Sequence, residues 1–184
     1  MKPNWFIALP VSAGRWFSPL VASTPLGIRR FHPEDLHVTV AFLGACGPER
    51  AQQAWQCIAE RRHEPVTARF GTLRPMGPQK RPSAYSLTFT EGRDALAAIV
   101  SWRDDALAAA GARPDRRPPL PHVTVARPPR RAGQAARQAG AAWMAQARPD
   151  STRVQLDRIA LYTWSTDRKQ RLFQMIAQRP LDGY

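Results

Sequence analysis

The chain has 184 residues, which is enough for one compact domain or for two small lobes that share a core. Apolar residues make up 43% of the sequence and recur along its whole length, so a chain that is disordered throughout is excluded. The net charge of +13 favours polyanionic partners, nucleic acid above all, although an arginine-rich sequence also follows from genome composition alone.

Cysteine usage and the N-terminal sequence indicate the compartment. Cys46 and Cys57 are too few for a framework of disulfides and do not form a CxxC pair, so we expect a reducing cytoplasm. The apolar run at residues 5–10 is too short for a signal peptide and ends in Pro10. No apolar stretch approaches the roughly 20 residues that span a bilayer. We therefore expect a cytoplasmic protein with no membrane partner, and we also expect it to be a monomer.

Apolar periodicity and turn residues predict the elements along the chain. In chain order they are a strand at 5–9, an irregular segment at 11–30 interrupted by two prolines, a strand at 36–43, a helix at 48–62, strands at 66–73 and 84–90, a helix at 93–110, a strand at 121–126, a helix at 132–147, and a hairpin of strands at 154–164 and 171–177 that turns around 165–169. Strands and helices are mixed without strict alternation, which predicts the α+β class.

One pentapeptide, His-Val-Thr-Val-Ala, occurs twice, at residues 37–41 and 122–126. The two copies begin 85 residues apart, close to half the length of the chain, and open with two of its four histidines. Each copy falls in a predicted strand that follows a proline-containing approach. The repeat predicts two similar halves that each present one strand to a shared cleft.

Strand geometry assigns the repeated residues to faces, because alternate side chains point to the same side of a sheet. We expect the polar and small positions on an open face: His37, Thr39, Ala41, His122, Thr124 and Ala126. We expect the other positions in the core: Val38, Val40, Phe42, Val123 and Val125. Two such open faces would bring two imidazoles and two hydroxyls around one small volume.

That set of groups suits phosphoester chemistry. Imidazole titrates near neutral pH, so one histidine accepts a proton while the other donates one. Threonine hydroxyls donate hydrogen bonds to the non-bridging phosphate oxygens, on which negative charge builds in the transition state. We therefore predict a metal-independent enzyme, without cofactor, that breaks a phosphoester bond in RNA or a nucleotide. His37 and His122 are its acid/base pair.

Other interpretations of the repeat are weaker. A lone histidine on a strand is more often structural than catalytic, but two copies at half-chain spacing favour a site. Zinc bound by His37 and His122 would need a third ligand, and His32 and His63 lack metal-ligand spacing to either motif. The threonines are also good strand formers, although their repetition beside the histidines favours a role.

Two His-x-Thr-x motifs half a chain apart resemble the signature of the 2H phosphoesterases. Within that superfamily the sequence is most similar to the bacterial RNA 2′,3′-cyclic phosphodiesterases, also called 2′-5′ RNA ligases. The resemblance spans nearly the whole chain. Its segments follow the family order and lie at residues 6–10, 32–44, 121–127 and 159–162.

The resemblance implies one domain over residues 1–184, made of two lobes of mostly antiparallel sheet related by a pseudo-twofold axis, with outer helices around a central groove. It implies hydrolysis of a 2′,3′-cyclic phosphate on RNA or a nucleotide to a 2′-phosphate, with weak reversible 2′-5′ joining of RNA ends. In that chemistry His122 is the general base that activates water, and His37 is the general acid that protonates the leaving 3′ oxygen. Thr39, Thr124 and Arg127 bind the phosphate.

The sequence departs from the family pattern in several places. Pro19 indicates a short or broken first helix, and the loop at 127–131 is unusually rich in proline. Trp164, with Leu172 or Phe173, replaces a small polar residue and a tyrosine. Strict alternation would place Arg127 on the face opposite His122, unless a strand end or a bulge re-aims it.

Arginines are concentrated on both sides of the second motif. They form either a contact surface for an RNA backbone or a solvated basic loop. The cluster consists of Arg113, Arg116, Arg117, Arg127, Arg130 and Arg131.

Two other functions stay open. The substrate could be a small nucleotide such as an ADP-ribose cyclic phosphate, although the basic loops slightly favour RNA. A non-catalytic RNA-binding module is the second alternative, and the intact His and Thr pairs count against it. ATP-dependent ligation is disfavoured because no lysine lies in a nucleotidyl-transfer motif.

Overall fold

The computed structural model describes residues 2–78, 81–129, 131–149 and 153–183. The strands are β1 (Trp5–Pro10), β2 (Arg29–Arg30), β3 (His37–Gly44), β4 (Val66–Met76), β5 (Ala84–Glu91), β6 (Val123–Arg127), β7 (Arg153–Leu156), β8 (Arg158–Trp164) and β9 (Phe173–Pro180). The helices are α1 (Gly14–Ala22), α2 (Pro48–Ala59), α3 (Arg93–Val100), α4 (Arg103–Ala109) and α5 (Gln134–Gln146), with a short 3-10 helix, η1, at Pro33–Asp35.

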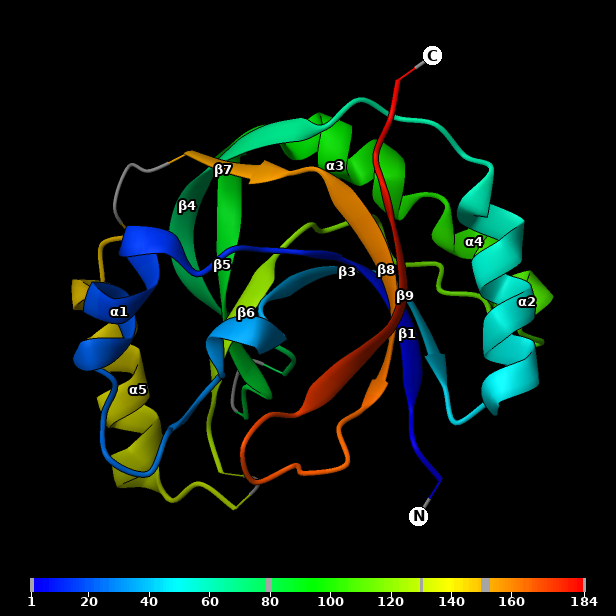
Figure 1. The fold of residues 1–184 in the computed structure, drawn as a ribbon. Coiled ribbons are helices and arrows are strands. Elements are labelled where there is room, and N and C mark those ends of the chain that lie inside the picture. Colours follow the sequence, from blue (N-terminus) through cyan, green and yellow to red (C-terminus); the bar gives the residue numbers. More distant parts are fainter. Residues whose placement is uncertain (1, 79–80, 130, 150–152, 184) are drawn as a thin grey trace.

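The strands of the described residues form one antiparallel sheet in the order β7-β4-β5-β6-β3-β1-β8-β9, with β2 added beside β6. The two motif strands, β3 and β6, meet at its centre through a single residue pair, Val38 and Val123. Strands β5, β4 and β7 continue one lobe from this centre, and β1, β8 and β9 continue the other. This arrangement is the predicted α+β fold of two similar lobes (Figure 1).

Strong curling brings the two ends of the sheet together. Only Asp157 separates β7 from β8, yet β7 pairs with β4 at one end and β8 pairs with β1 and β9 near the other. The prediction of one strand over 154–164 is therefore wrong at Asp157, a residue type with low strand propensity, where the chain changes partners. The carbonyl of Asp157 accepts a hydrogen bond from the Leu181 amide (2.7 Å), which fastens the end of β9 to this corner.

The segment predicted to be irregular contains a helix, α1, with Pro19 inside it. Proline in a helix costs about 3 kcal/mol, because it removes one hydrogen bond and crowds the preceding turn. Burying a large apolar side chain contributes about 1.5–3 kcal/mol, so four of them outweigh that cost. The buried side chains are Trp16, Phe17, Leu20 and Val21.

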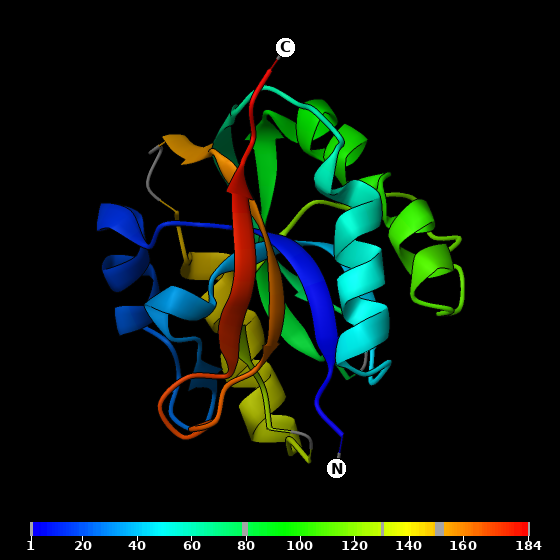
Figure 2. The same ribbon diagram turned by 45° about the vertical axis from the view of Figure 1, so that its right-hand side comes forward.

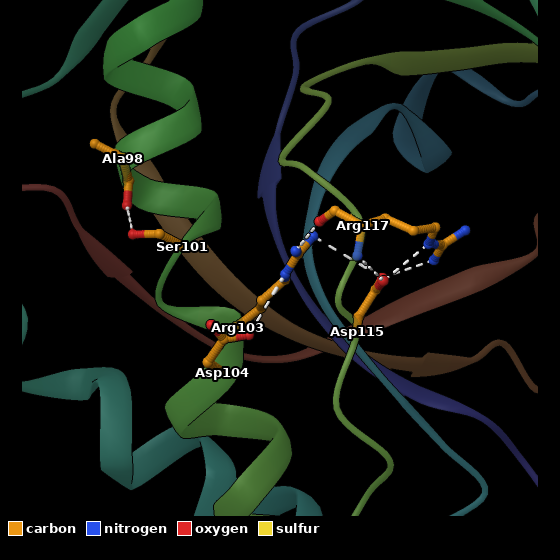
Figure 3. Close-up of polar contacts among 6 residues, drawn as sticks. All are labelled: Ala98, Ser101, Arg103, Asp104, Asp115 and Arg117. Atoms are coloured by element: carbon orange, nitrogen blue, oxygen red, sulfur yellow. Dashed lines mark hydrogen bonds and ion pairs between the residues drawn. The ribbon is translucent and has the colours of Figure 1, made fainter.

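The single helix predicted over 93–110 is two helices, α3 and α4, with a break at Ser101 and Trp102. The Ser101 hydroxyl donates to the carbonyl of Ala98 (2.6 Å), and the Trp102 amide donates to the carbonyl of Ile99 (3.1 Å; Figure 3 shows the serine contact). Serine that bonds back to its own helix competes with the backbone ladder. The tighter turn ends α3 and gives α4 a new direction.

Helices cover the two flanks of the curled sheet. Figures 1 and 2 show α2 beside α4 on one flank and α1 with α5 on the other. The indole nitrogen of Trp143 in α5 donates to the hydroxyl of Ser23 at the end of α1 (3.2 Å). Within the described residues, no helix has the length and apolar character needed to cross a bilayer.

Two apolar clusters lie on opposite faces of the sheet. The large core unites both lobes, and it contains the valines of both motifs as predicted: Val38, Val40, Val123 and Val125. A smaller cluster, on the other face of β1 and β8, consists of Phe6, Ala8, Ala160 and Tyr162, with Phe173 packed against it. β1 is thus buried on both faces, which explains why its sequence is apolar without alternation.

Candidate active site

Both motif strands shift register at the same position of the pentapeptide. In β3, Val40 has no partner in β1, and in β6, Val125 has no partner in β5. An extra residue of this kind is what a β-bulge introduces, and it reverses the alternation of side chains beyond it. The two copies of the pentapeptide therefore share a register shift as well as a sequence.

The predicted faces hold as far as this shift and are wrong beyond it. Ala41 and Ala126, expected beside the histidines, are buried in the large core. Phe42, expected in the core, is 58% exposed. It pairs across the ladder with Phe6, whose ring packs on His37, so Phe42 lies on the histidine side of the sheet.

Arg127 is re-aimed by the same shift, so that it returns to the side of His122. We call the side of β3 and β6 that carries His37, Thr39, His122 and Thr124 the motif face. β3 and β6 pair through Val38 and Val123, the residues directly after the two histidines, and the shift at Val125 puts Arg127 on the same face of β6 as Thr124.

Each motif histidine is held by the backbone in the same way. His37 Nδ1 lies 2.7 Å from the carbonyl oxygen of Asp35, and His122 Nδ1 lies 2.7 Å from that of Leu120. A carbonyl oxygen only accepts, so Nδ1 carries the proton of each neutral ring and donates it. Nε2 of each ring is left as the basic nitrogen.

Aromatic rings surround His37. Its ring centroid lies 4.8 Å from that of Phe6, 5.8 Å from Tyr162 and 5.5 Å from Phe173. Burial among these rings lowers the pKa of His37 from 6.5 to about 4, against the opposing effect of its bond to the Asp35 carbonyl. His37 is therefore a neutral imidazole at neutral pH when the face is empty.

His122 has a more polar setting. Burial lowers its pKa, the bond to the Leu120 carbonyl opposes this, and the charge of Arg117 lowers it further. Arg117 is fixed by a two-point contact with Asp115, Nε to Oδ1 at 2.8 Å and Nη2 to Oδ2 at 2.6 Å. Figure 3 shows Asp115 between Arg117 and Arg103 of α4, so the loop that leads into the second motif is tied to that helix.

The two motif threonines differ in their neighbours. Thr124 Oγ1 lies 3.0 Å from the hydroxyl of Ser86 in β5, a fully buried side chain. Thr39 faces Ala8 of β1 instead, which has no hydroxyl. Ser86 was not predicted, and its one signal in the sequence is a lone small polar residue at the apolar start of a strand.

Asp35, also not predicted, joins the first motif to the C-terminal hairpin. Its buried carboxylate accepts hydrogen bonds from the amides of Leu172 (2.8 Å) and Phe173 (3.0 Å). The same residue therefore holds His37 through its carbonyl and positions the Phe173 ring through its carboxylate. His32 has a structural role nearby, because its Nδ1 accepts from the Glu34 amide at the start of η1 (3.2 Å).

In the part of the chain that the structure describes, no group of three His, Cys, Asp or Glu side chains is placed to hold a metal ion. The polar groups of the motif face are two imidazoles, two hydroxyls and one guanidinium.

Comparison with known proteins assigns the chain to a family. The sequence profile of the 2′-5′ RNA ligase superfamily matches residues 16–168. An RNA 2′,3′-cyclic phosphodiesterase of Bacillus subtilis (strain 168) is 28% identical over 133 residues, which cover 69% of this chain and 72% of the relative.

Two solved structures share the fold across almost their entire length. E. coli LigT complexed with 3′-AMP superimposes with a TM-score of 0.74 at 18% identity, covering 98% of this chain and 99% of that one. TT0787 of Thermus thermophilus superimposes with a TM-score of 0.72 at 17% identity, covering 98% of both chains. With the profile match, the repeated motif and the two-lobed sheet, the chain belongs to the 2′-5′ RNA ligase superfamily, a family of 2H phosphoesterases.

Proposed function

We propose that this protein hydrolyses the 2′,3′-cyclic phosphate of RNA ends or nucleotides and leaves a 2′-phosphate. The observation that carries the proposal is the matched pair of histidines, each fixed by the same 2.7 Å bond from Nδ1 to a backbone carbonyl two residues earlier. This bond orients both rings and leaves both Nε2 atoms for proton transfer to a phosphate between them.

The proposed reaction is an in-line displacement at phosphorus. Nε2 of His122 accepts a proton from water, and the water oxygen forms a bond to phosphorus. The bond from phosphorus to the 3′ oxygen breaks, and protonated His37 donates its Nε2 proton to that oxygen. Thr39, Thr124 and Arg127 donate hydrogen bonds to the non-bridging oxygens, and Ser86 orients the Thr124 hydroxyl.

The acid role of His37 requires the substrate itself. With a pKa of about 4, His37 carries no proton on Nε2 at neutral pH in the empty protein. A bound phosphate brings negative charge next to the imidazole, which favours the imidazolium form and raises its pKa. Substrate binding thus favours protonation of His37, while His122 faces the attacking water.

Three observations support a nucleotide as the substrate. Phe42 exposes 58% of its surface on the motif face, where a flat aromatic ring suits stacking with a nucleobase. The Bacillus subtilis relative is named an RNA 2′,3′-cyclic phosphodiesterase, and E. coli LigT has been solved with 3′-AMP. A 5′-hydroxyl in place of water would attack the same phosphorus and form a 2′-5′ linkage, which is the weak joining reaction we also propose.

Replacing either histidine tests this proposal. His37→Ala and His122→Ala should each lower kcat on a nucleoside 2′,3′-cyclic phosphate by about 10²–10⁴-fold, the usual size of an acid/base contribution. The double variant should be little worse than the single ones, because each histidine works only with its partner present. Turnover and the 2′-phosphate product are measured by chromatography.

Controls separate the alternatives. Activity of the wild-type protein should survive exhaustive chelation; loss with rescue by zinc would move the site to metal hydrolysis. Turnover confined to ADP-ribose cyclic phosphate would identify a small-nucleotide enzyme. If the wild-type protein binds RNA but turns over no cyclic phosphate, the proposed function is wrong and the protein is a binding module.

A further inference from the structure

Three arginines from separate segments meet at one end of the motif face. Arg29 of β2 and Arg127 of β6 are directly paired in the antiparallel ladder, so their side chains leave the sheet on the same side. Arg168 comes from the loop between β8 and β9, and its carbonyl accepts a hydrogen bond from Arg29 Nη2 (3.0 Å). We call Arg29, Arg127 and Arg168 the arginine triad.

Aromatic rings support two members of the triad. The Arg127 guanidinium carbon lies 5.2 Å from the ring centroid of Phe31, and that of Arg168 lies 4.1 Å from the ring centroid of Trp164. Cation–π contacts of this kind hold a guanidinium in place while its N–H groups stay available to a ligand. All three arginines are exposed.

Among the described residues, the charge of the triad is left without an ion-pair partner. Within the described residues, none of its members forms an ion pair with a carboxylate. Desolvation lowers the pKa of Arg127, and the charges of Arg168 and Arg29 lower it further. Like charges placed opposite each other across a ladder are destabilising, and a bound anion would relieve this repulsion.

The position of the triad suggests which anion. Arg127 is the last residue of β6, at the end of the strand away from His122, and the shift at Val125 puts it on the motif face. Arg29 pairs with Arg127 at this end of the strand, and Arg168 is bonded to Arg29 through its carbonyl. Arg127 also borders a cavity of about 800 Å³ whose other arginines are Arg81, Arg131 and Arg137, so the cationic surface continues outward.

The arginine cluster predicted from the sequence is only partly in this place. Arg127 and Arg131 line the cavity, whereas Arg117 is occupied by Asp115. Arg113 and Arg116 are exposed in the loop before the second motif, and Arg130 lies outside the described residues. Arg29 and Arg168, which lie far from that motif in the sequence, were not predicted to lie beside Arg127.

We propose that Arg29 and Arg168, together with Arg127, bind a second phosphate of the substrate, on the 5′ side of the nucleotide that carries the cyclic phosphate. Guanidinium groups match phosphate with two parallel hydrogen bonds, and three of them suit its several oxygens. The inference rests on the proposed function for its reaction. The second phosphate is either the 5′-phosphate of a mononucleotide or the phosphodiester that continues an RNA chain, because both present the same anionic oxygens.

The test compares substrates that differ in this second phosphate. Arg29→Gln, Arg168→Gln and the double variant are assayed on a nucleoside 2′,3′-cyclic phosphate, on its 5′-phosphorylated form, and on a short RNA with a cyclic end. Arg93→Gln is the matched control, because Arg93 is exposed on α3 and its loss changes the net charge equally.

We expect Arg29→Gln and Arg168→Gln each to lower kcat/KM about 10-fold or more on substrates with a second phosphate, mainly through KM, and to leave turnover of the nucleoside 2′,3′-cyclic phosphate unchanged. A fall on both phosphorylated substrates assigns the site to RNA ends, and a fall on the mononucleotide alone assigns it to 5′-phosphorylated nucleotides. An equal fall on all three substrates, or no fall on any, overturns the proposal.

A binding measurement separates this inference from the proposed reaction. Affinity for a short single-stranded RNA with a 2′-phosphate end is measured by fluorescence anisotropy over a range of salt concentrations. Each lost phosphate contact should reduce the slope of log K against log salt by about 0.7, whereas Arg93→Gln should not change it. If the wild-type protein hydrolyses no cyclic phosphate but the arginine substitutions reduce the salt slope of RNA binding, only the proposed function fails. If the wild-type protein hydrolyses the cyclic phosphate but the substitutions leave the salt slope unchanged, only the triad inference fails.

Discussion

The two histidines of the repeated motif share one backbone contact and little else in their surroundings. His37 is enclosed by three aromatic rings, while His122 borders the charged Arg117. Groups of one type whose environments differ in this way are suited to opposite roles in proton transfer. The difference arises from residues outside the repeat, because the five residues of the repeat are identical.

These surroundings predict an acidic pH profile. Both histidine pKa values lie below 6.5 in the empty protein, so kcat/KM, which reports the free enzyme, should be bell-shaped with both limbs below 6.5. The profile of kcat should lie at higher pH, because bound phosphate raises both pKa values. Initial rates on a nucleoside cyclic phosphate across the pH range measure both.

Phe173→Ala supplies the control for this profile. The substitution opens one side of the ring cluster around His37, so the lower limb should move up toward 6.5 as water reaches the imidazole. A limb that stays in place would show that burial by these rings does not set the pKa of His37.

At the scale of elements, one buried carboxylate couples η1, the first motif strand and β9. Asp35 accepts from two amides of the C-terminal hairpin, more than 130 residues away in sequence, while its carbonyl holds His37. Neither the hairpin nor η1 positions the histidine alone. The register shift at Val40 then decides which residues after His37 lie on the motif face.

Asp35→Asn should therefore reduce both stability and activity. The asparagine amide would place a donor against a backbone amide, so one buried N–H loses its acceptor at a cost of roughly 1–3 kcal/mol in the free energy of unfolding. We expect kcat to fall while KM changes little, because Phe173 and His37 lose their alignment. Urea unfolding and steady-state kinetics measure the two effects.

Glu34→Gln is the matched control for that variant. Glu34 precedes Asp35, is exposed, and pairs with Arg171 on the surface, where an ion pair contributes about 0–1 kcal/mol. The proposed coupling would be refuted by an Asp35→Asn protein as stable and active as the Glu34→Gln protein.

At the scale of the whole molecule, keeping a neutral histidine inside the fold makes stability depend on pH. The unfolded chain protonates His37 near 6.5, whereas the folded protein resists protonation until about 4. Between these values the unfolded state binds more protons, so lowering the pH favours unfolding. Below about 4 both states are protonated, and the loss is complete.

The free energy of unfolding should thus fall between pH 7 and pH 4, and His37 should account for roughly 1–3 kcal/mol of the change. Urea denaturation at several pH values measures the wild-type protein and His37→Gln side by side. The variant should depend less on pH across this range, because all other titrating groups are shared. Parallel curves for the two proteins would contradict the prediction.

Local patterns in the sequence determined the strands around both motifs, the α+β class and the valines of the core. These predictions succeed because alternation along a strand is a property of neighbouring residues. The same locality explains the errors. A shift at Val40 and Val125 reversed the expected faces of Phe42 and Arg127, and it depends on pairing with β1 and β5, which no local pattern contains.

Tertiary structure alone decided the remaining features. α1 forms around Pro19 because its apolar face finds a core, and β7 and β8 separate at Asp157 because the curled sheet offers each a different partner. The rings around His37 and the arginine triad join segments from residue 6 to residue 173. Burial and charge at a site are sums over spatial neighbours. The sequence therefore determined which chemical groups are available, whereas the fold determined which groups are neighbours and how their pKa values shift.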